Sequence, residues 1–205
     1  MCFDTQSSLL AWSLALSIAF YLFNRNQNYD RWNAAFIICF TLIQLLEGGI
    51  WETLGESAVV NDLLTRLILI VLVAQPLIQS YFGYKYTQDS TLLGFTAVYL
   101  IIMVISLFRV GTSKPGQFSS APGPSGHLIW SDSKSKNFIG CGMIAMLYLA
   151  GLMVPLMFMK DYKWVPLVLI GVGTALYSLW IAGKDEFSSY WCFVSVLYAV
   201  TCLFV

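Results

Sequence analysis

The sequence predicts an all-α membrane protein: seven transmembrane helices bundled into a single domain that spans residues 1–205. Hydrophobic residues make up 58% of the chain and charged residues only 11%, and several apolar runs are long enough to cross a bilayer. A soluble domain has about 25% charged residues, so this chain has too little polar surface for a water-soluble globule. The formal net charge of zero excludes the basic surface that a nucleic-acid partner requires.

A helix that crosses a bilayer needs about 20 mostly apolar residues, and seven stretches of the chain meet this requirement. The expected spans cover residues 8–23, 32–54, 63–84, 91–110, 137–159, 164–183 and 187–205. Within them, runs such as residues 67–73 do not alternate between apolar and polar side chains, as the strands of a membrane barrel would. Helices satisfy their own backbone groups in lipid, so we expect every span to be helical.

Polar residues separate the expected spans. The segment 24–31 ends the first span, and Gly55 and Glu56 end the second. Asn61 or Asp62 is expected to cap the third helix, because asparagine and aspartate side chains accept hydrogen bonds from free N–H groups at a helix start.

The fourth and fifth spans are joined by the one long connection, residues 111–136. Its first part, up to Gly126, is rich in proline, glycine and serine, which is typical of a flexible loop. Its second part, residues 127–130, is more apolar. We expect this part either to dock on the helix bundle or to lie as an amphipathic patch at the membrane interface.

Seven spans place the two termini on opposite sides of the membrane. Outside the long connection and its flanks, lysine and arginine favour the side of Arg25, Arg31, Lys85, Lys160 and Lys163. Positive loops stay in the cytoplasm, so the N-terminus is expected outside and the C-terminus inside. The expected partners are the lipid bilayer, protons, ions or a small molecule, and a second copy of the chain. No cofactor is expected.

Glu47 is the main candidate for a functional residue because it lies well inside the second apolar run. A carboxylate at membrane depth costs several kcal/mol unless it is paired, hydrated or protonated. Gln44 and Trp51 share its helix face, and Gly48 would let another helix approach. Glu47 is therefore expected to accept a proton, bind an ion or act as a general base. The alternative is a structural, protonated side chain that bonds a neighbouring helix, for example through glutamines of the third span.

Two further helices carry polar candidates for an ion or substrate site. Gln75 and Gln79 share one face of the third span, although they could also simply join helices. Ser188, Cys192 and Ser195 share one face of the last span and could line a polar seam, although close packing of small residues explains them equally well.

His127 is the single histidine of the chain and lies in the long connection. A lone loop histidine is most often solvated, but a docked segment would bring it towards Glu47 or Cys2. A cluster of Cys2, Glu47 and His127 could then bind a metal. The other four cysteines form no C-x-x-C pair and are expected to be buried as small apolar residues.

Four short motifs resemble those of an uncharacterised family of small polytopic membrane proteins found in bacteria and giant algal viruses. They are Met1-Cys2-Phe3-Asp4-(x)3-Ser8, Gln44-Leu45-Leu46-Glu47-Gly48-Gly49-Ile50-Trp51, Gly126-His127-Leu128-Ile129-Trp130 and Ser189-Tyr190-Trp191-Cys192-Phe193. The chain departs from the family at Asp4, where the family has serine. The resemblance implies a shared seven-helix fold and draws attention to Cys2, Glu47, His127 and Cys192. It implies no activity.

Three functions fit these observations. The first is a small transporter or channel, proton-linked, with Glu47 in a polar seam. The second is an intramembrane lipid hydrolase in which Glu47, His127 and a metal activate water. The third is a structural membrane protein of a virion or of a larger complex.

Overall fold

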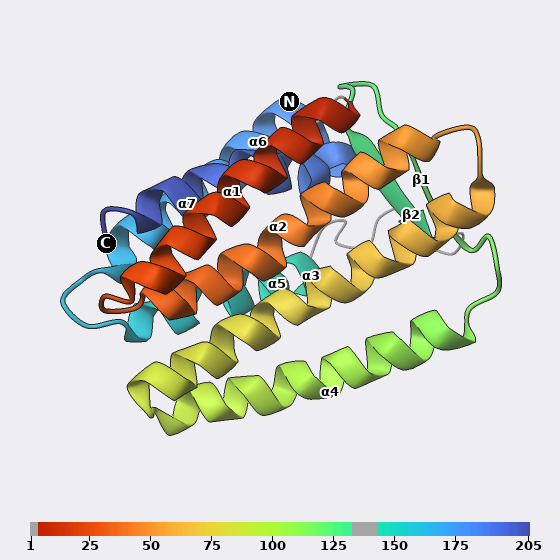
Figure 1. The fold of residues 1–205 in the computed structure, drawn as a ribbon. Helices are drawn as coiled ribbons and strands as arrows, with labels where there is room; N and C mark the ends of the chain where they lie inside the picture. Colours follow the sequence, from red (N-terminus) through yellow and green to blue (C-terminus); the bar gives the residue numbers. More distant parts are fainter. Residues whose placement is uncertain (1–3, 133–142) are drawn as a thin grey trace.

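A computed structural model describes residues 4–132 and 143–205, and the chain is mostly helical (Figure 1). Four helices come first, followed by a β-hairpin and then by shorter and broken helices. In chain order the elements are α1 (Thr5–Arg25), α2 (Asp30–Thr53), α3 (Ala58–Thr87), α4 (Ser90–Thr112), β1 (Phe118–Pro122), β2 (Leu128–Asp132), α5 (Met143–Met153), the 3-10 helix η1 (Pro155–Phe158), α6 (Trp164–Val194) and α7 (Val196–Cys202).

Side-chain caps fix where three of the long helices begin. The Asp4 carboxylate accepts from the Ser7 backbone N–H at 2.7 Å, and the Asp89 carboxylate from that of Thr91 at 2.8 Å. The prediction of a cap at Asn61 or Asp62 is wrong. Helix α3 begins one turn earlier, where the Ser57 side chain accepts from the backbone N–H of Val60. Asn61 and Asp62 therefore lie inside the helix, and their side chains are free for tertiary contacts.

Five helices of the described part are long and apolar enough to cross a membrane, which indicates a membrane protein. They are α1 to α4 and the first part of α6, Trp164–Gly183. The predicted fifth span appears in the described residues only as the short helices α5 and η1, and its residues 137–142 lie outside them. Helix α6 breaks at Gly183 (φ 68°, ψ −172°), so the predicted last span corresponds to its final part and α7.

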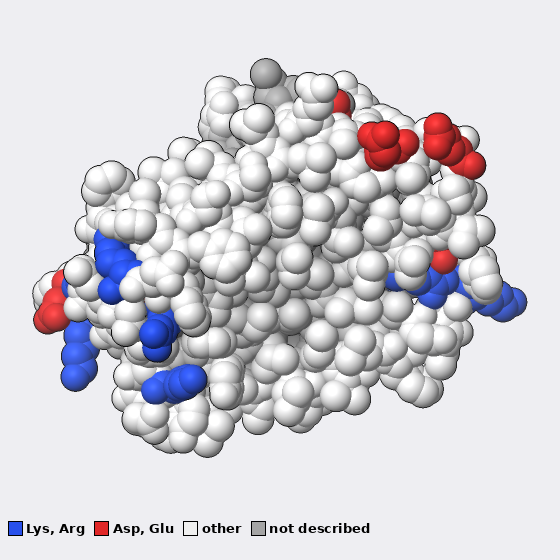
Figure 2. All heavy atoms as spheres, viewed as in Figure 1, with Lys and Arg blue, Asp and Glu red and all other residues white. Residues whose placement is uncertain are grey.

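The two ends of the bundle are held by polar contacts. At one end, the Thr5 hydroxyl donates to the Glu52 carboxylate at 3.2 Å, so α1 starts where α2 finishes. At the other end, Arg25 pairs with Asp30 at 2.7 Å and donates to the carbonyl of Leu203 at 2.8 Å. Figure 2 shows charged side chains at both ends of the visible face, with an uncharged band between them. This distribution suits a protein whose middle faces lipid.

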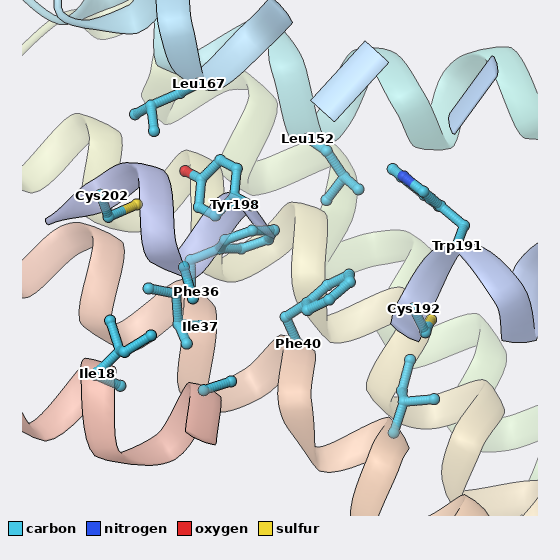
Figure 3. Packing of buried hydrophobic residues seen from close by; sticks show 14 of the residues in the cluster. Ile18, Phe36, Ile37, Phe40, Leu152, Leu167, Trp191, Cys192, Tyr198 and Cys202 are labelled. Carbon is cyan, nitrogen blue, oxygen red and sulfur yellow. The ribbon is translucent and has the colours of Figure 1, made fainter. Parts of the chain in front are cut away.

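Aromatic rings fill the middle of the bundle, between α2 and the last helices (Figure 3). The ring of Phe36 lies 5.7 Å from that of Phe40 and 5.3 Å from that of Tyr198, centroid to centroid. The ring of Phe40 in turn meets Trp191 edge-on at 6.5 Å. Edge-to-face aromatic pairs of this kind stabilise a core beyond their area burial.

The long connection is not simply the flexible loop that its composition predicts, because part of it forms an antiparallel β-hairpin with Ser120 opposite Trp130. Its side chains Phe118, Leu128 and Trp130 are at most 4% exposed. Of the two alternatives for residues 127–130, these buried side chains support docking on the bundle. Each strand has only five residues and does not alternate regularly between apolar and polar side chains, so the sequence did not distinguish the hairpin from a loop.

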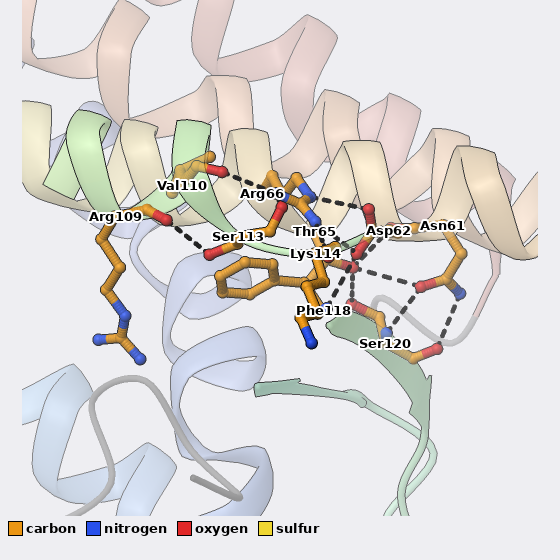
Figure 4. A network of polar contacts seen from close by, with 10 residues as sticks. All are labelled: Asn61, Asp62, Thr65, Arg66, Arg109, Val110, Ser113, Lys114, Phe118 and Ser120. Atoms are coloured by element: carbon orange, nitrogen blue, oxygen red, sulfur yellow. Dashed lines mark hydrogen bonds and ion pairs between the residues drawn. The ribbon is translucent and has the colours of Figure 1, made fainter. Parts of the chain in front are cut away.

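Helix α3 holds the hairpin through polar side chains (Figure 4). Asn61 bonds both backbone groups of Ser120: its Oδ1 accepts from the N–H at 2.7 Å, and its Nδ2 donates to the carbonyl at 2.9 Å. Asp62 accepts from the backbone N–H of Phe118 at 2.9 Å and also pairs with Arg66 at 2.7 Å. The α3 side chains thus take the place of a third strand beside β1.

Replacing Asn61 with alanine should lower thermal stability. The two Ser120 backbone groups would lose their partners, and an unsatisfied buried polar group costs about 1–3 kcal/mol. The melting temperature in detergent should fall for Asn61→Ala and stay unchanged for Asn24→Ala, which removes an exposed asparagine of α1. Equal melting temperatures for the two variants would contradict the anchoring role.

Candidate functional site

Glu47 is completely buried, and neither of its carboxyl oxygens has a hydrogen-bond partner among the residues that the structure describes. It lies six residues before the end of α2 at Thr53, which is about 9 Å along the helix axis. An ionised carboxylate without a partner is far more costly to bury than the neutral acid. The geometry therefore favours a protonated Glu47 in this conformation.

Five residues on four segments carry buried polar atoms without a hydrogen-bond partner in the described structure, and we call them the Glu47 cluster: Ser8, Glu47, Trp51, Trp130 and Ser189. Trp130 of the hairpin and Ser189 of α6 lie within reach of the carboxyl group. Ser8 packs beside α2, since a Cβ placed on Gly48 would lie 3.6 Å from the Cβ of Ser8. The Ser8 and Ser189 hydroxyls and the Trp51 and Trp130 indole N–H groups are buried and, within the described structure, also lack a hydrogen-bond partner.

Each of the four motifs quoted above contributes a residue to the Glu47 cluster. Ser8 belongs to the first, Glu47 and Trp51 to the second, Trp130 to the third and Ser189 to the fourth. Sequence reasoning chose His127 and Cys192 from the last two motifs and missed Trp130 and Ser189.

Comparison of the chain with protein-family models, curated proteins and solved structures finds no match.

The glutamines of α3 are engaged elsewhere. Gln75 accepts a hydrogen bond from the hydroxyl of Tyr148. Gln79 accepts from the Trp32 indole at 3.1 Å and donates to the carbonyl of Leu152 at 3.2 Å. These bonds join helices, as the structural alternative expects for the two amides. Neither glutamine bonds Glu47, so the example partners of the structural alternative do not hold this carboxyl group.

The remaining candidates on the helices lie at different depths from Glu47. Gln44 is completely buried one turn before it on α2. Cys192 packs in the apolar core beside the aromatic rings (Figure 3). The Ser195 hydroxyl donates to the backbone carbonyl of Cys192 at 3.0 Å. Cys192 and Ser195 therefore take part in close packing and in the internal bonds of their own helix.

His127 is buried rather than solvated, because the hairpin carries it under the end of the bundle. Its ring meets the ring of Tyr190 edge-on, with the centroids 4.6 Å apart. Burial lowers the pKa of His127 to about 4, although the nearby Glu186 carboxylate acts in the opposite direction. The described residues contain no group of three histidine, cysteine, aspartate or glutamate side chains suited to a metal, and Cys2 lies outside them.

Glu186 is a second buried acid that sequence reasoning missed. It is 3% exposed and binds the hairpin turn: the backbone N–H groups of Ser125 and His127 donate to it at 2.9 and 3.0 Å, and the Ser125 hydroxyl also donates. A Cβ at Gly123 would lie 2.5 Å from the Glu186 Cγ, so the turn needs glycine there. Unlike Glu47, this carboxylate has several donors.

Replacing Glu47 with methionine should raise the melting temperature, because it removes a buried polar group that has no partner. The matched change Gln79→Met should lower it, because the buried Trp32 indole would lose its acceptor. Each effect should be about 1–3 kcal/mol. Thermal unfolding of both variants in the same detergent tests this contrast, and destabilisation by Glu47→Met would argue for an important bond to its carboxyl group.

The buried His127 should make stability fall in mild acid. Its folded pKa of about 4 lies below the ordinary value of 6.5, so between these pH values the unfolded chain binds the extra proton. Stability should then decrease by up to about 1.4 kcal/mol per pH unit on going down through this window. Melting temperatures of the wild type and His127→Gln should diverge as the pH falls below 6.5, with the variant less sensitive; parallel curves would contradict the assignment.

Proposed function

We propose that the protein is a small proton-linked membrane transporter in which Glu47 takes up and releases the proton. The observation that carries this proposal is a fully buried carboxyl group that has no hydrogen-bond partner in the described structure and has the polar side chains of Trp130 and Ser189 within reach. Ionisable groups inside membrane helices are rare and mark proton relays and ion or substrate pathways.

The surroundings of Glu47 suit a group that changes its charge. Trp130 and Ser189 can turn an indole N–H and a hydroxyl towards an ionised carboxylate, while neither is held by another bond within the described structure. Hydrogen bonds to a charged group are worth about 1.5–3 kcal/mol each. The cluster thus offers donors to the ionised form of Glu47, and its apolar surroundings favour the neutral form.

Glu47 is fully buried in the conformation described here, which favours a transporter over an open channel. Towards the nearer end of α2, the hairpin covers the cluster with Trp130. A change of one charge at Glu47 would shift the balance between this closed conformation and an open one.

Proton movement into liposomes tests the proposal directly. Purified protein is reconstituted into vesicles that contain a pH-sensitive dye, and a potassium diffusion potential drives protons inward. The wild type should acidify the lumen, and Glu47→Gln should remove most of this flux because the amide cannot exchange a proton.

Glu56→Gln is the matched control, since it makes the same change at an exposed residue just beyond α2 and should retain the wild-type rate. Thermal unfolding of each variant checks that it remains folded. Equal flux for the wild type and Glu47→Gln, or no flux for the wild type above protein-free vesicles, would overturn the proposal.

A further inference from the structure

The hairpin is attached to the bundle in two different ways. On the α3 side, Asn61 and Asp62 bond the backbone of β1, and the guanidinium of Arg66 stacks over the Phe118 ring at 4.9 Å. These anchors lie close together on one uninterrupted helix. On the α6 side, the backbone N–H groups of the turn converge on the single carboxylate of Glu186. Three side chains of α3 would have to lose their contacts to release β1, whereas only the Glu186 side chain would have to do so to release the turn.

The segment that carries Glu186 is itself separated from the rest of α6. Gly183 has φ 68°, a value that other residues rarely adopt, and it breaks the helix one turn before Glu186. Ser189 of the Glu47 cluster follows Glu186 by three residues, so both lie on the same short helical segment after the break. A movement of this segment about Gly183 would displace the Glu186 carboxylate and the Ser189 hydroxyl together.

The part of the hairpin next to this attachment covers Glu47. His127 and Leu128 are 0% and 1% exposed, and Trp130 is the hairpin side chain that reaches the carboxyl group. If the turn leaves Glu186 and the whole hairpin rotates about its β1 attachment to α3, these three side chains move away from α6 together. The route from Glu47 to the nearer end of α2 is then about 9 Å long.

We propose that the β-hairpin is a hinged lid over Glu47, fixed to α3 through β1 and held shut by a latch in which the Glu186 carboxylate binds the turn at Ser125 and His127. Its purpose, to admit protons or cargo to Glu47 from one side, depends on the proposed function. The existence of the lid does not, because it is tested below by the accessibility of a side chain and not by transport.

His127 reports lid opening, since it is the single histidine of the sequence and is fully buried when the lid is closed. Diethyl pyrocarbonate acylates the neutral imidazole, so slow reaction near pH 7 measures shielding and not protonation. The protein is purified through a tag without histidine, and mass spectrometry follows modification of the peptide that contains His127. The wild type should react much more slowly than N-acetylhistidine.

Two variants should open the lid by different routes. Glu186→Gln removes the charge that binds the turn, and Gly123→Ala places a Cβ where the Glu186 side chain lies. Loss of even one charge-assisted hydrogen bond in the closed state predicts about a ten-fold or greater rise in the modification rate for each variant. Glu56→Gln, at an exposed site, is the control and should react like the wild type.

The rate of His127 modification tests the lid independently of the proposed transport function. Unchanged modification rates in both folded variants would overturn the lid, as would a wild-type rate close to that of N-acetylhistidine. Faster modification together with unchanged vesicle flux would support a lid and count against its role in the proposed function. A variant that no longer unfolds cooperatively is replaced by Ser125→Ala, which removes only the hydroxyl bond to Glu186 and should raise the rate by a smaller factor.

Discussion

Burial of the Glu47 carboxyl group is the constraint on which the arrangement around it depends. A neutral carboxylic acid among apolar helices already loses its bonds to water, and an ionised one cannot stay without donors. The fold places one segment after another against this group: α1 beside Gly48, the hairpin through Trp130, and the last part of α6 through Ser189. A hairpin covers the end of the bundle nearest Glu47. Its buried backbone groups then need hydrogen-bond partners from outside the hairpin.

Side chains of the neighbouring helices form hydrogen bonds with the backbone of the hairpin. A two-stranded sheet has two unpaired edges, and an edge buried against helices leaves backbone groups without partners. Asn61 presents an amide that pairs with Ser120 as a neighbouring strand would, and Glu186 accepts the N–H groups of the turn. Both residues lie near helix ends or breaks, where a polar side chain can serve the hairpin without entering the apolar middle of the bundle.

Much of the helical fold could be predicted from the sequence, and most of the site could not. Long apolar runs and polar breaks predict α1 to α4 and the Gly183 break, and the depth of Glu47 in its run predicts its burial. The contacts that define the site join residues far apart in the chain, such as Ser125 and Glu186, 61 positions from each other. Helical or strand periodicity contains no information on such pairs.

The hairpin was missed because its five-residue strands, the first of them rich in serine and proline, give a weak pattern. Trp130 and Ser189 were missed because an aromatic or a small residue near the end of a span is usually explained by packing.

Several buried aromatic donors outside the Glu47 cluster have hydrogen-bond acceptors. The Trp32 indole bonds Gln79 at 3.1 Å, the Trp191 indole bonds Thr174 at 3.1 Å, and the Tyr198 hydroxyl bonds Asn33 at 3.3 Å. The Thr41 hydroxyl and the Gln75 amide nitrogen, by contrast, have no partner within the described structure. Trp51 and Trp130 carry the same indole group in the same core but have no acceptor within the described structure, and they belong to the cluster of the one acid that lacks donors. Buried polar groups in folded proteins are almost always satisfied, so the gathering of several unsatisfied groups in the Glu47 cluster requires an explanation. The proposed proton exchange would give that explanation, because donors fixed permanently to other partners could not turn to Glu47 when it loses its proton.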